Sequence, residues 1–186
     1  MSANKTTRLR EAVTELILEV FRLNGRLLAV GDALVSDIGL SSARWQVLGA
    51  AALSPVPLPV AHLARNMGLT RQSVQRLVDD MTNDGLVRYA PNPHHRRAKL
   101  VLLTDRGQMA YRAAMDRQAP WAHELAAGLT PEAILSATSI LRGLRGRIDR
   151  DVTAGSETAA SLSVKRTYNH GGLGRNGRRG LNTGPA

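Results

Sequence analysis

Apolar residues in the middle of the chain recur at helical spacing and mark two short helices joined by a tight turn. The first begins near Pro59 and ends at Gly68, whose missing Cβ permits the positive φ that closes a helix. Thr70 can cap the second helix, because its hydroxyl accepts hydrogen bonds from free N–H groups of the first turn. Apolar side chains then fall at three- and four-residue steps on one face: Val74, Leu77, Val78 and Met81. The pattern predicts helix, turn, helix, with the second helix burying this face.

Two short apolar runs follow, and they predict the strands of a hairpin. Gly85 ends the second helix, residues 86–89 form a strand, and Asn92 and Pro93 end that strand. Residues 99–103 supply the return strand. The loop between the strands carries four basic or titratable side chains: His94, His95, Arg96 and Arg97. This order of elements over residues 58–107 is that of a winged helix-turn-helix, and it makes double-stranded DNA the leading partner.

The polar face of the second helix and the basic loop hold the candidate DNA contacts. In the major groove Arg reads guanine and Gln reads adenine, while arginines on a loop can enter the negative minor groove. The expected DNA-binding residues are Thr70, Arg71, Gln72, Ser73, Gln75, Arg76, Arg96, Arg97 and Lys99. Asp79 would repel phosphate, so we expect it at the interface edge or paired with a neighbouring Arg. The alternative for the loop is a solvated basic segment without a partner.

Helical segments on both sides of this region predict a dimer. Residues 6–37 are apolar over a wide arc, which must be buried against more than one neighbour. Near the other end, apolar residues alternate at three- and four-residue steps, as in a two-helix seam: Ile134, Ala137, Leu141, Leu144 and Ile148. We therefore expect a mainly α fold with a small β-hairpin wing. Its winged DNA-binding domain, residues 41–107, would sit on dimerisation helices at 6–37 and 108–152. For the seam near the C-terminal end, packing within the monomer is the alternative.

Composition and charge limit the classes of partner that the chain can have. The chain has 186 residues and a formal net charge of +10, which favours polyanions. It shows no apolar run near the ~18 residues needed to span a bilayer and no signal peptide, so we expect a cytoplasmic protein without a membrane partner. Residues 153–186, rich in Ser, Gly and Arg, predict a disordered basic tail. The charge and this tail also support an alternative function, that of an architectural or non-specific DNA-binding protein.

The sequence offers no convincing enzyme or metal site. It contains no cysteine, which excludes thiolate metal ligands and a peroxide-sensing thiol. His94 and His95 are adjacent and would point to opposite sides of an extended segment, while His62 and His123 lack a ligand one helical turn away. No Gly-rich phosphate loop or nucleophile elbow is present. We expect neither an enzyme nor a metal or other cofactor.

Over residues 6–152 the chain resembles the MarR family of bacterial transcription regulators. The segments that carry the resemblance are LILEVFRLNGRLL, SSARWQVLGA, LARNMGLTRQSVQRLVDDMTNDGLV and NPHHRRAKLVLLTDRG. The resemblance implies a homodimer that binds a pseudo-palindrome, usually as a repressor. It also implies release by a small aromatic or anionic effector, which enters a pocket between the dimer platform and the DNA-binding head.

The resemblance also bears on particular residues. It places Trp45 where a wall of the pocket would be, with a simple core Trp as the alternative. In the wing the family commonly carries Asp, any residue, Arg, whereas this chain has His95, Arg96 and Arg97. Arg97 keeps the arginine. His95 cannot hold that guanidinium by charge, and a protonated His95 would face phosphate, so we expect a looser wing with more pH-dependent binding.

Overall fold

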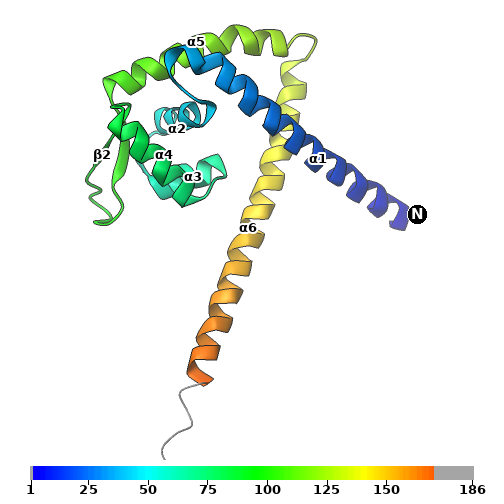
Figure 1. The fold of residues 1–186 in the computed structure, drawn as a ribbon. Coiled ribbons are helices and arrows are strands. Elements are labelled where there is room, and N and C mark those ends of the chain that lie inside the picture. Colours follow the sequence, from blue (N-terminus) through cyan, green and yellow to red (C-terminus); the bar gives the residue numbers. More distant parts are fainter. Residues whose placement is uncertain (1, 170–186) are drawn as a thin grey trace, which may run out of the picture. The chain divides into compact units, whose positions relative to one another are not determined.

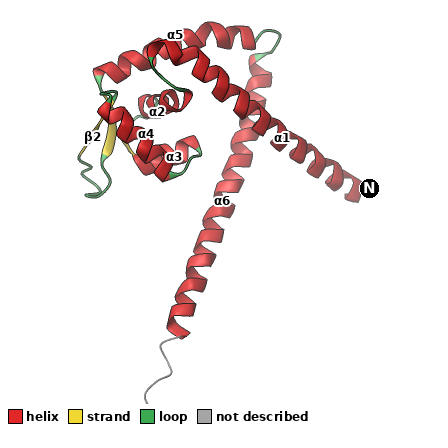
Figure 2. Cartoon of the chain, in the orientation of Figure 1, coloured by secondary structure: helices red, strands yellow, loops and turns green. Residues whose placement is uncertain are grey.

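The structure, a computed structural model, describes the backbone of residues 2–169 and the side chains of residues 4–151. The chain forms two compact units, residues 1–127 and residues 128–186. The fold is mainly helical with one small antiparallel sheet, as predicted, and Figures 1 and 2 show the helices and the hairpin. In the described residues, no helix is long and apolar enough to cross a membrane.

The first unit contains every element except the last. In chain order its elements are α1 (Ser2–Val35), η1 (Ser36–Ile38), α2 (Ser42–Ala52), β1 (Leu58–Pro59), α3 (Val60–Met67), α4 (Arg71–Asn83), β2 (Val87–Ala90), β3 (Leu100–Leu103) and α5 (Asp105–Leu125). We call the part from α2 to the start of α5 the head. In Figure 1, α2, α3, α4 and the β2–β3 hairpin lie together, and α1 extends away from them toward the N-terminus.

The turn between α3 and α4 has the predicted local structure. Gly68 is left-handed with φ of 66°, and its N–H closes α3 on the carbonyls of Ala64 and Arg65. The Thr70 hydroxyl accepts from the N–H of Ser73 at 3.1 Å, which caps α4. These short-range signals place the start of α4, and with it the outward face of that helix.

The sheet contains the predicted hairpin and one further strand. β2 pairs with β3 in antiparallel register, Val87 opposite Leu103 and Ala90 opposite Leu100. β1 adds to the other side of β3, which gives the order β1-β3-β2. The sequence did not indicate β1, since two residues show no alternation and the second is a proline, a residue tolerated only on edge strands.

The core of the head lies beneath α4. Val74, Val78 and Met81 are fully buried, as the apolar stripe predicts, and Leu77 is half-buried against them. They pack with side chains from the other head elements: Val47, Leu48, Leu63, Ala64, Val87, Val101 and Ala114. This packing leaves the opposite face of α4 in solvent.

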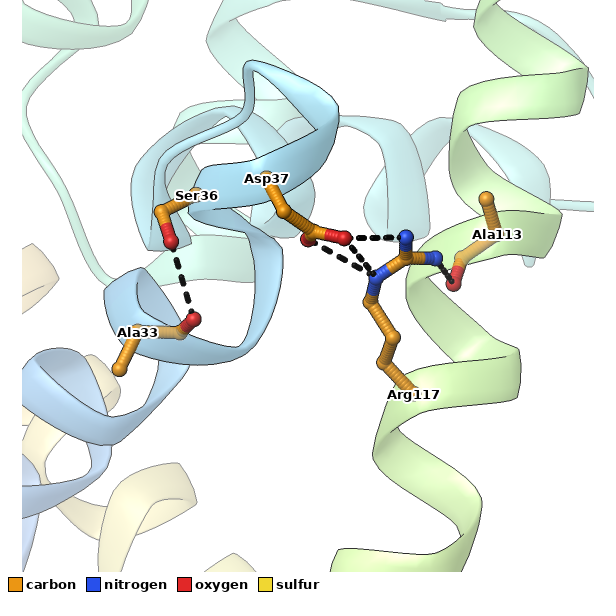
Figure 3. A network of polar contacts seen from close by, with 5 residues as sticks. All are labelled: Ala33, Ser36, Asp37, Ala113 and Arg117. Carbon is orange, nitrogen blue, oxygen red and sulfur yellow. Dashed lines mark hydrogen bonds and ion pairs between the residues drawn. The ribbon is translucent and has the colours of Figure 1, made fainter.

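The C-terminal end of α1 is joined to the head by close contacts. A Cβ on Gly31 would lie 2.8 Å from the Oγ of Ser42, so the absent side chain lets α2 approach α1. Asp32 Oδ1 accepts from the N–H of Ser42 at 2.6 Å. Next to this contact, Arg117 of α5 donates to both carboxylate oxygens of Asp37 in η1, with the shortest distance 2.6 Å from Nη2 to Oδ2 (Figure 3). The hydrogen bonds from Arg117 hold the pKa of Asp37 below its usual value.

Among the described residues, most side chains of α1 are exposed. The predicted wide apolar arc is present, and its large side chains are exposed: Leu9, Ile17, Leu18, Val20, Phe21, Leu23, Leu27 and Leu28. Exposure of so many large apolar side chains on one helix is typical of a protein–protein interface.

The second unit is described here by its helix α6 (Pro131–Asn169). The predicted seam residues Ile134, Leu141 and Ile148 are exposed on it, and Leu144 is half-buried. The helical backbone runs on past residue 153, where we expected the basic tail to begin, through a segment with several helix-favouring Ala, Leu and Glu residues. Residues 170–186 of that tail lie outside the described residues.

Candidate DNA-binding surface

The predicted contact residues of α4 lie on its outward face. Arg71, Gln72, Ser73 and Arg76 are exposed, whereas Gln75 is half-buried. The N-terminal end of α4 therefore presents two guanidinium groups and several hydrogen-bonding groups to solvent, a combination suited to base edges and phosphates.

A groove separates α4 and α3 from the hairpin loop. It has a volume of about 1020 Å³, and its polar lining comes from both sides. It brings together four of the predicted site residues: Arg71, Gln75, Arg97 and Lys99. The other predicted site residues do not line the groove: Thr70, Gln72, Ser73, Arg76 and Arg96. The groove thus brings Arg71 and Gln75 of α4 and the wing residues Arg97 and Lys99 into one surface.

Sequence reasoning missed two residues of this groove on α3. His62 and Arg65 are exposed and line it from the side of the first helix. Their signal was present, since both are polar positions on a helix that buries Leu63 and Ala64 in the core. A cation on α3 at a groove edge suits a phosphate contact beside the main helix.

Asp79 pairs with Gln75 and Tyr89 and not with an arginine, so of the two alternatives for this residue the arginine pair is wrong. Asp79 Oδ1 accepts from the Tyr89 hydroxyl at 2.7 Å and from Gln75 Nε2 at 3.0 Å, while Gln75 Nε2 also donates to the Tyr89 oxygen at 2.7 Å. We call these three side chains the Gln75–Asp79–Tyr89 triad. Burial, and next the Asp79 carboxylate, raise the pKa of Tyr89 to about 12.

The triad connects the hairpin to α4. Tyr89 lies on β2, and the ammonium of Lys99 lies 5.7 Å from the centre of its ring, within range of a cation–π contact. Tyr89 was not among the predicted site residues, because nothing local distinguishes a strand tyrosine that reaches a helix residue ten positions earlier. Tyr89 thus links β2 of the wing to Gln75 and Asp79 of α4.

Asn92 organises the hairpin loop. Its side-chain Oδ1 accepts from the N–H of His94 at 3.0 Å, and its carbonyl accepts from the N–H of His95 at 3.2 Å. The side chains of His95 and Arg97 are exposed, and neither forms a hydrogen bond or ion pair within residues 4–151. In the described residues Arg97 therefore has no carboxylate partner.

A second cavity lies where α1 meets α2 and α5. It has a volume of about 370 Å³ and contains Trp45 together with Tyr111, Met115 and Trp121. The lining of this cavity also includes Leu27, Leu34, Gln46 and Gln118. The resemblance placed Trp45 at such a wall, but the contribution of Trp121 was not anticipated. An aromatic and apolar lining with two amides is suited to a planar organic molecule.

The described residues hold no group of three or more His, Cys, Asp or Glu side chains placed to bind a metal ion.

Comparison with protein families and curated proteins gives consistent results. Residues 38–98, which span α2 to the hairpin loop, match the sequence model of the MarR family. An uncharacterized protein of Mycobacterium tuberculosis is 33% identical over 132 residues, covering 71% of this chain and 91% of that protein. The transcriptional activatory protein BadR of Rhodopseudomonas palustris is 31% identical over 100 residues, covering 53% of this chain and 57% of BadR.

Solved structures share the fold. A mutant MarR from E. coli in complex with operator DNA has a TM-score of 0.61 at 19% identity, covering 72% of this chain and 95% of that one. CouR from Rhodococcus jostii RHA1, bound to p-coumaroyl-CoA, has a TM-score of 0.64 at 22% identity, covering 70% and 91%. At these identities the likeness concerns the fold.

Proposed function

Since the chain belongs to the MarR family of winged helix-turn-helix transcriptional regulators, we propose that it represses transcription from a pseudo-palindromic operator and is released by a small organic ligand. That family consists of DNA-binding regulators, so the chain is a DNA-binding transcriptional regulator and not an enzyme. We propose that it acts in the cytoplasm. The observation that supports the proposed DNA binding is the groove lined by residues of α4 and of the hairpin loop.

The proposed DNA contacts divide between the two grooves of the duplex. α4 enters the major groove with Arg71, Gln72, Gln75 and Arg76 toward base edges, while Thr70 and Ser73 reach phosphates. Arg96 and Arg97 extend from the hairpin loop into the adjacent minor groove. Lys99 of the wing contacts the sugar-phosphate backbone of the DNA. A single head offers too small a surface for tight specific binding, so an operator of two half-sites requires two heads.

The proposed partner that supplies the second head is another copy of this chain. The exposed apolar side chains of α1 and the exposed seam of α6 supply the area that a homodimer would bury. In this assignment residues 6–37 and 108–152 are dimerisation helices, residues 41–107 bind DNA, and residues 153–186 add a basic extension that strengthens non-specific binding.

The proposed effector site is the Trp45 cavity. Its aromatic wall favours a flat aromatic ligand, and its two amides can orient a polar or anionic substituent. CouR, which shares this fold, was solved with an aromatic acyl-CoA. Because the cavity is lined by α1 as well as by α2 and α5, a ligand that prefers one placement of α1 relative to the head changes the spacing of two heads in a dimer.

Arg76→Ala tests the proposal of sequence-specific recognition. We expect selection from a random duplex pool to yield a pseudo-palindrome, and the variant to lose about 1 to 3 kcal/mol of discrimination at one base position in each half-site. The measurement is competition binding of all four bases at each position, at near-physiological salt. A uniform loss over all sequences would reassign Arg76 to phosphate. A wild-type protein that prefers no duplex by more than about tenfold would be an architectural or non-specific DNA-binding protein.

Ligand release is tested by screening aromatic acids and phenols against the operator complex. A ligand that reduces binding a hundredfold must prefer the DNA-incompetent state by about 2.7 kcal/mol. We expect the same ligand to change tryptophan fluorescence, and Trp45→Phe, with Trp121 retained, to remove part of that change, since both rings line the cavity. Release by peroxide or zinc without response to any organic ligand would contradict the proposal.

A further inference from the structure

We infer that the Trp45 cavity takes an uncharged aromatic molecule and rejects anionic ones. This inference rests on the proposed effector site, and it deepens that proposal by naming the charge of the ligand. The cavity, of about 370 Å³, is large enough for a small planar ring system. The charge that it tolerates follows from the side chains in its wall and from the charged groups just outside it.

In the described residues no charged side chain lines the cavity. Its walls come from α1, α2 and α5, and the side chains that line it are apolar, aromatic, hydroxyl or amide groups. A carboxylate placed among them would lose water without meeting a cation, which costs far more than the burial of an uncharged polar group. An amide or a phenol of the same shape loses only hydrogen bonds that the wall can replace.

The arginines of the three helices lie outside the wall. Arg44 of α2 pairs with Asp84 at 2.7 Å, and Arg117 of α5 pairs with Asp37 at 2.6 Å. Arg112 of α5 lines a separate cavity beside β3. The remaining basic side chains of α1, α2 and α5 are exposed and do not line the Trp45 cavity. The structure therefore offers an anionic ligand no side-chain cation in this wall.

The N-terminus of α2 borders the cavity, and its anion-binding groups are already used. Helix N-termini attract anions through their free N–H groups and the helix dipole. At α2 the Ser42 N–H donates to Asp32 Oδ1 at 2.6 Å, and the Arg44 N–H donates to the Ser41 hydroxyl at 3.3 Å. Because Ser42 lines the cavity, a carboxylate is in contact with this part of the wall. Its charge adds repulsion to the desolvation cost of an anionic ligand.

Gln118 is the group in the wall best placed to bind an uncharged polar substituent. It is half-buried, and within residues 4–151 its side chain has no hydrogen-bond partner. A primary amide carries donors and an acceptor, so it matches a ligand amide or hydroxyl without any charge. The second amide, that of Gln46, donates through Nε2 to the Ser42 hydroxyl at 3.3 Å, and in the same range its oxygen accepts no hydrogen bond.

Pairs of ligands that differ only in charge test the inference. 2-Naphthamide and 2-naphthoate share a ring and nearly the same shape, and at about pH 7 only the second is charged. We expect calorimetric titration of the full chain, without DNA, to show that the amide binds at least about tenfold more tightly. Benzamide with benzoate, and quinoline-2-carboxamide with quinoline-2-carboxylate, repeat the comparison. Quenching of tryptophan fluorescence locates each probe, because both tryptophans of the chain line this cavity.

Gln118→Lys tests whether the missing cation is the cause. An ammonium in the wall should strengthen binding of 2-naphthoate by about tenfold and should not strengthen binding of 2-naphthamide. Asn83→Lys is the matched control, since it adds the same charge at an exposed position of the head that lines neither this cavity nor the groove beside α4. We expect it to leave both affinities unchanged.

Asp32→Asn tests the contribution of the carboxylate. The asparagine oxygen can still accept from the Ser42 N–H, so the contact between α1 and α2 is kept while the charge is removed. We expect the preference for 2-naphthamide over 2-naphthoate to fall by about threefold, because the repulsion is lost and the desolvation cost remains.

The outcomes are distinguishable. The inference is overturned if the carboxylate of any pair binds as tightly as its amide, if no amide of the three pairs binds, or if Gln118→Lys and Asn83→Lys have the same effect. An amide that binds in the cavity and does not release the protein from its operator would instead reject the proposed effector role, while the preference for an uncharged ligand would stand.

Discussion

Replacing Gly107 with alanine is expected to lower the free energy of unfolding of the head by about 3 kcal/mol or more, a large share of the stability of a typical domain. Gly107 is buried in the first turn of α5, and a Cβ there would overlap the carbonyl oxygen of Leu86. Alanine is favoured over glycine in a helix by about 1 kcal/mol, so a net loss of stability must come from this overlap.

The Leu86 backbone cannot move aside easily. Its N–H donates to the carbonyl of Met81 at 2.9 Å, and its carbonyl accepts from the N–H of Thr104 at 3.1 Å. The Thr104 hydroxyl also donates to the carbonyl of Gly85 at 2.6 Å. A shift of the backbone at Leu86, directly before β2, would break the hydrogen bonds that join the end of α4, the hairpin and the start of α5.

Urea denaturation followed by circular dichroism measures the effect. Gly49→Ala in α2 is the matched control, because its Cβ would meet only the Tyr111 ring at 3.6 Å, an ordinary contact. We expect this control to be neutral or more stable by up to about 1 kcal/mol. Equal unfolding midpoints for Gly107→Ala and the wild type would show that the backbone at Leu86 adapts.

A double substitution on α1, Ile17→Asp with Phe21→Asp, is expected to convert the proposed dimer into a monomer and to weaken operator binding at least about a hundredfold. These residues lie one turn apart and are 41% and 70% exposed within the chain. Two carboxylates at these positions therefore do not disturb the core of the monomer. Buried against a partner helix, they would cost several kcal/mol, because each charge would be removed from water without a counter-charge.

Sedimentation velocity at micromolar concentration and operator titration together check this expectation. The matched control, Arg8→Gln with Arg26→Gln, lowers the net charge by the same two units at exposed positions of α1 that lie nine residues from Ile17, on the opposite face of the helix. A control that stays dimeric beside a monomeric Ile17→Asp/Phe21→Asp variant would locate the interface on the apolar arc. The dimer proposal fails if the wild type sediments as a stable 20.0 kDa monomer.

The elements of the head could be predicted from the sequence because their causes are local. The left-handed turn at Gly68, the Thr70 cap and the apolar stripe of α4 each depend on residues within a few positions of one another. The hairpin was predictable for the same reason. Its strands are short apolar runs. Gly85 precedes the first strand, and Asn92 and Pro93 lie in the loop between the two strands.

The tertiary structure decided which side chains meet across elements. Tyr89 and Asp79 lie ten residues apart in the sequence, and their contact depends on the distance between the hairpin and α4. The packing of the core beneath α4 sets that distance. The same holds for Trp121 beside Trp45 and for the strand β1. Periodicity specifies which face of an element is buried. It does not specify the distance or rotation between two elements, so a polar contact between them follows only from the packed core.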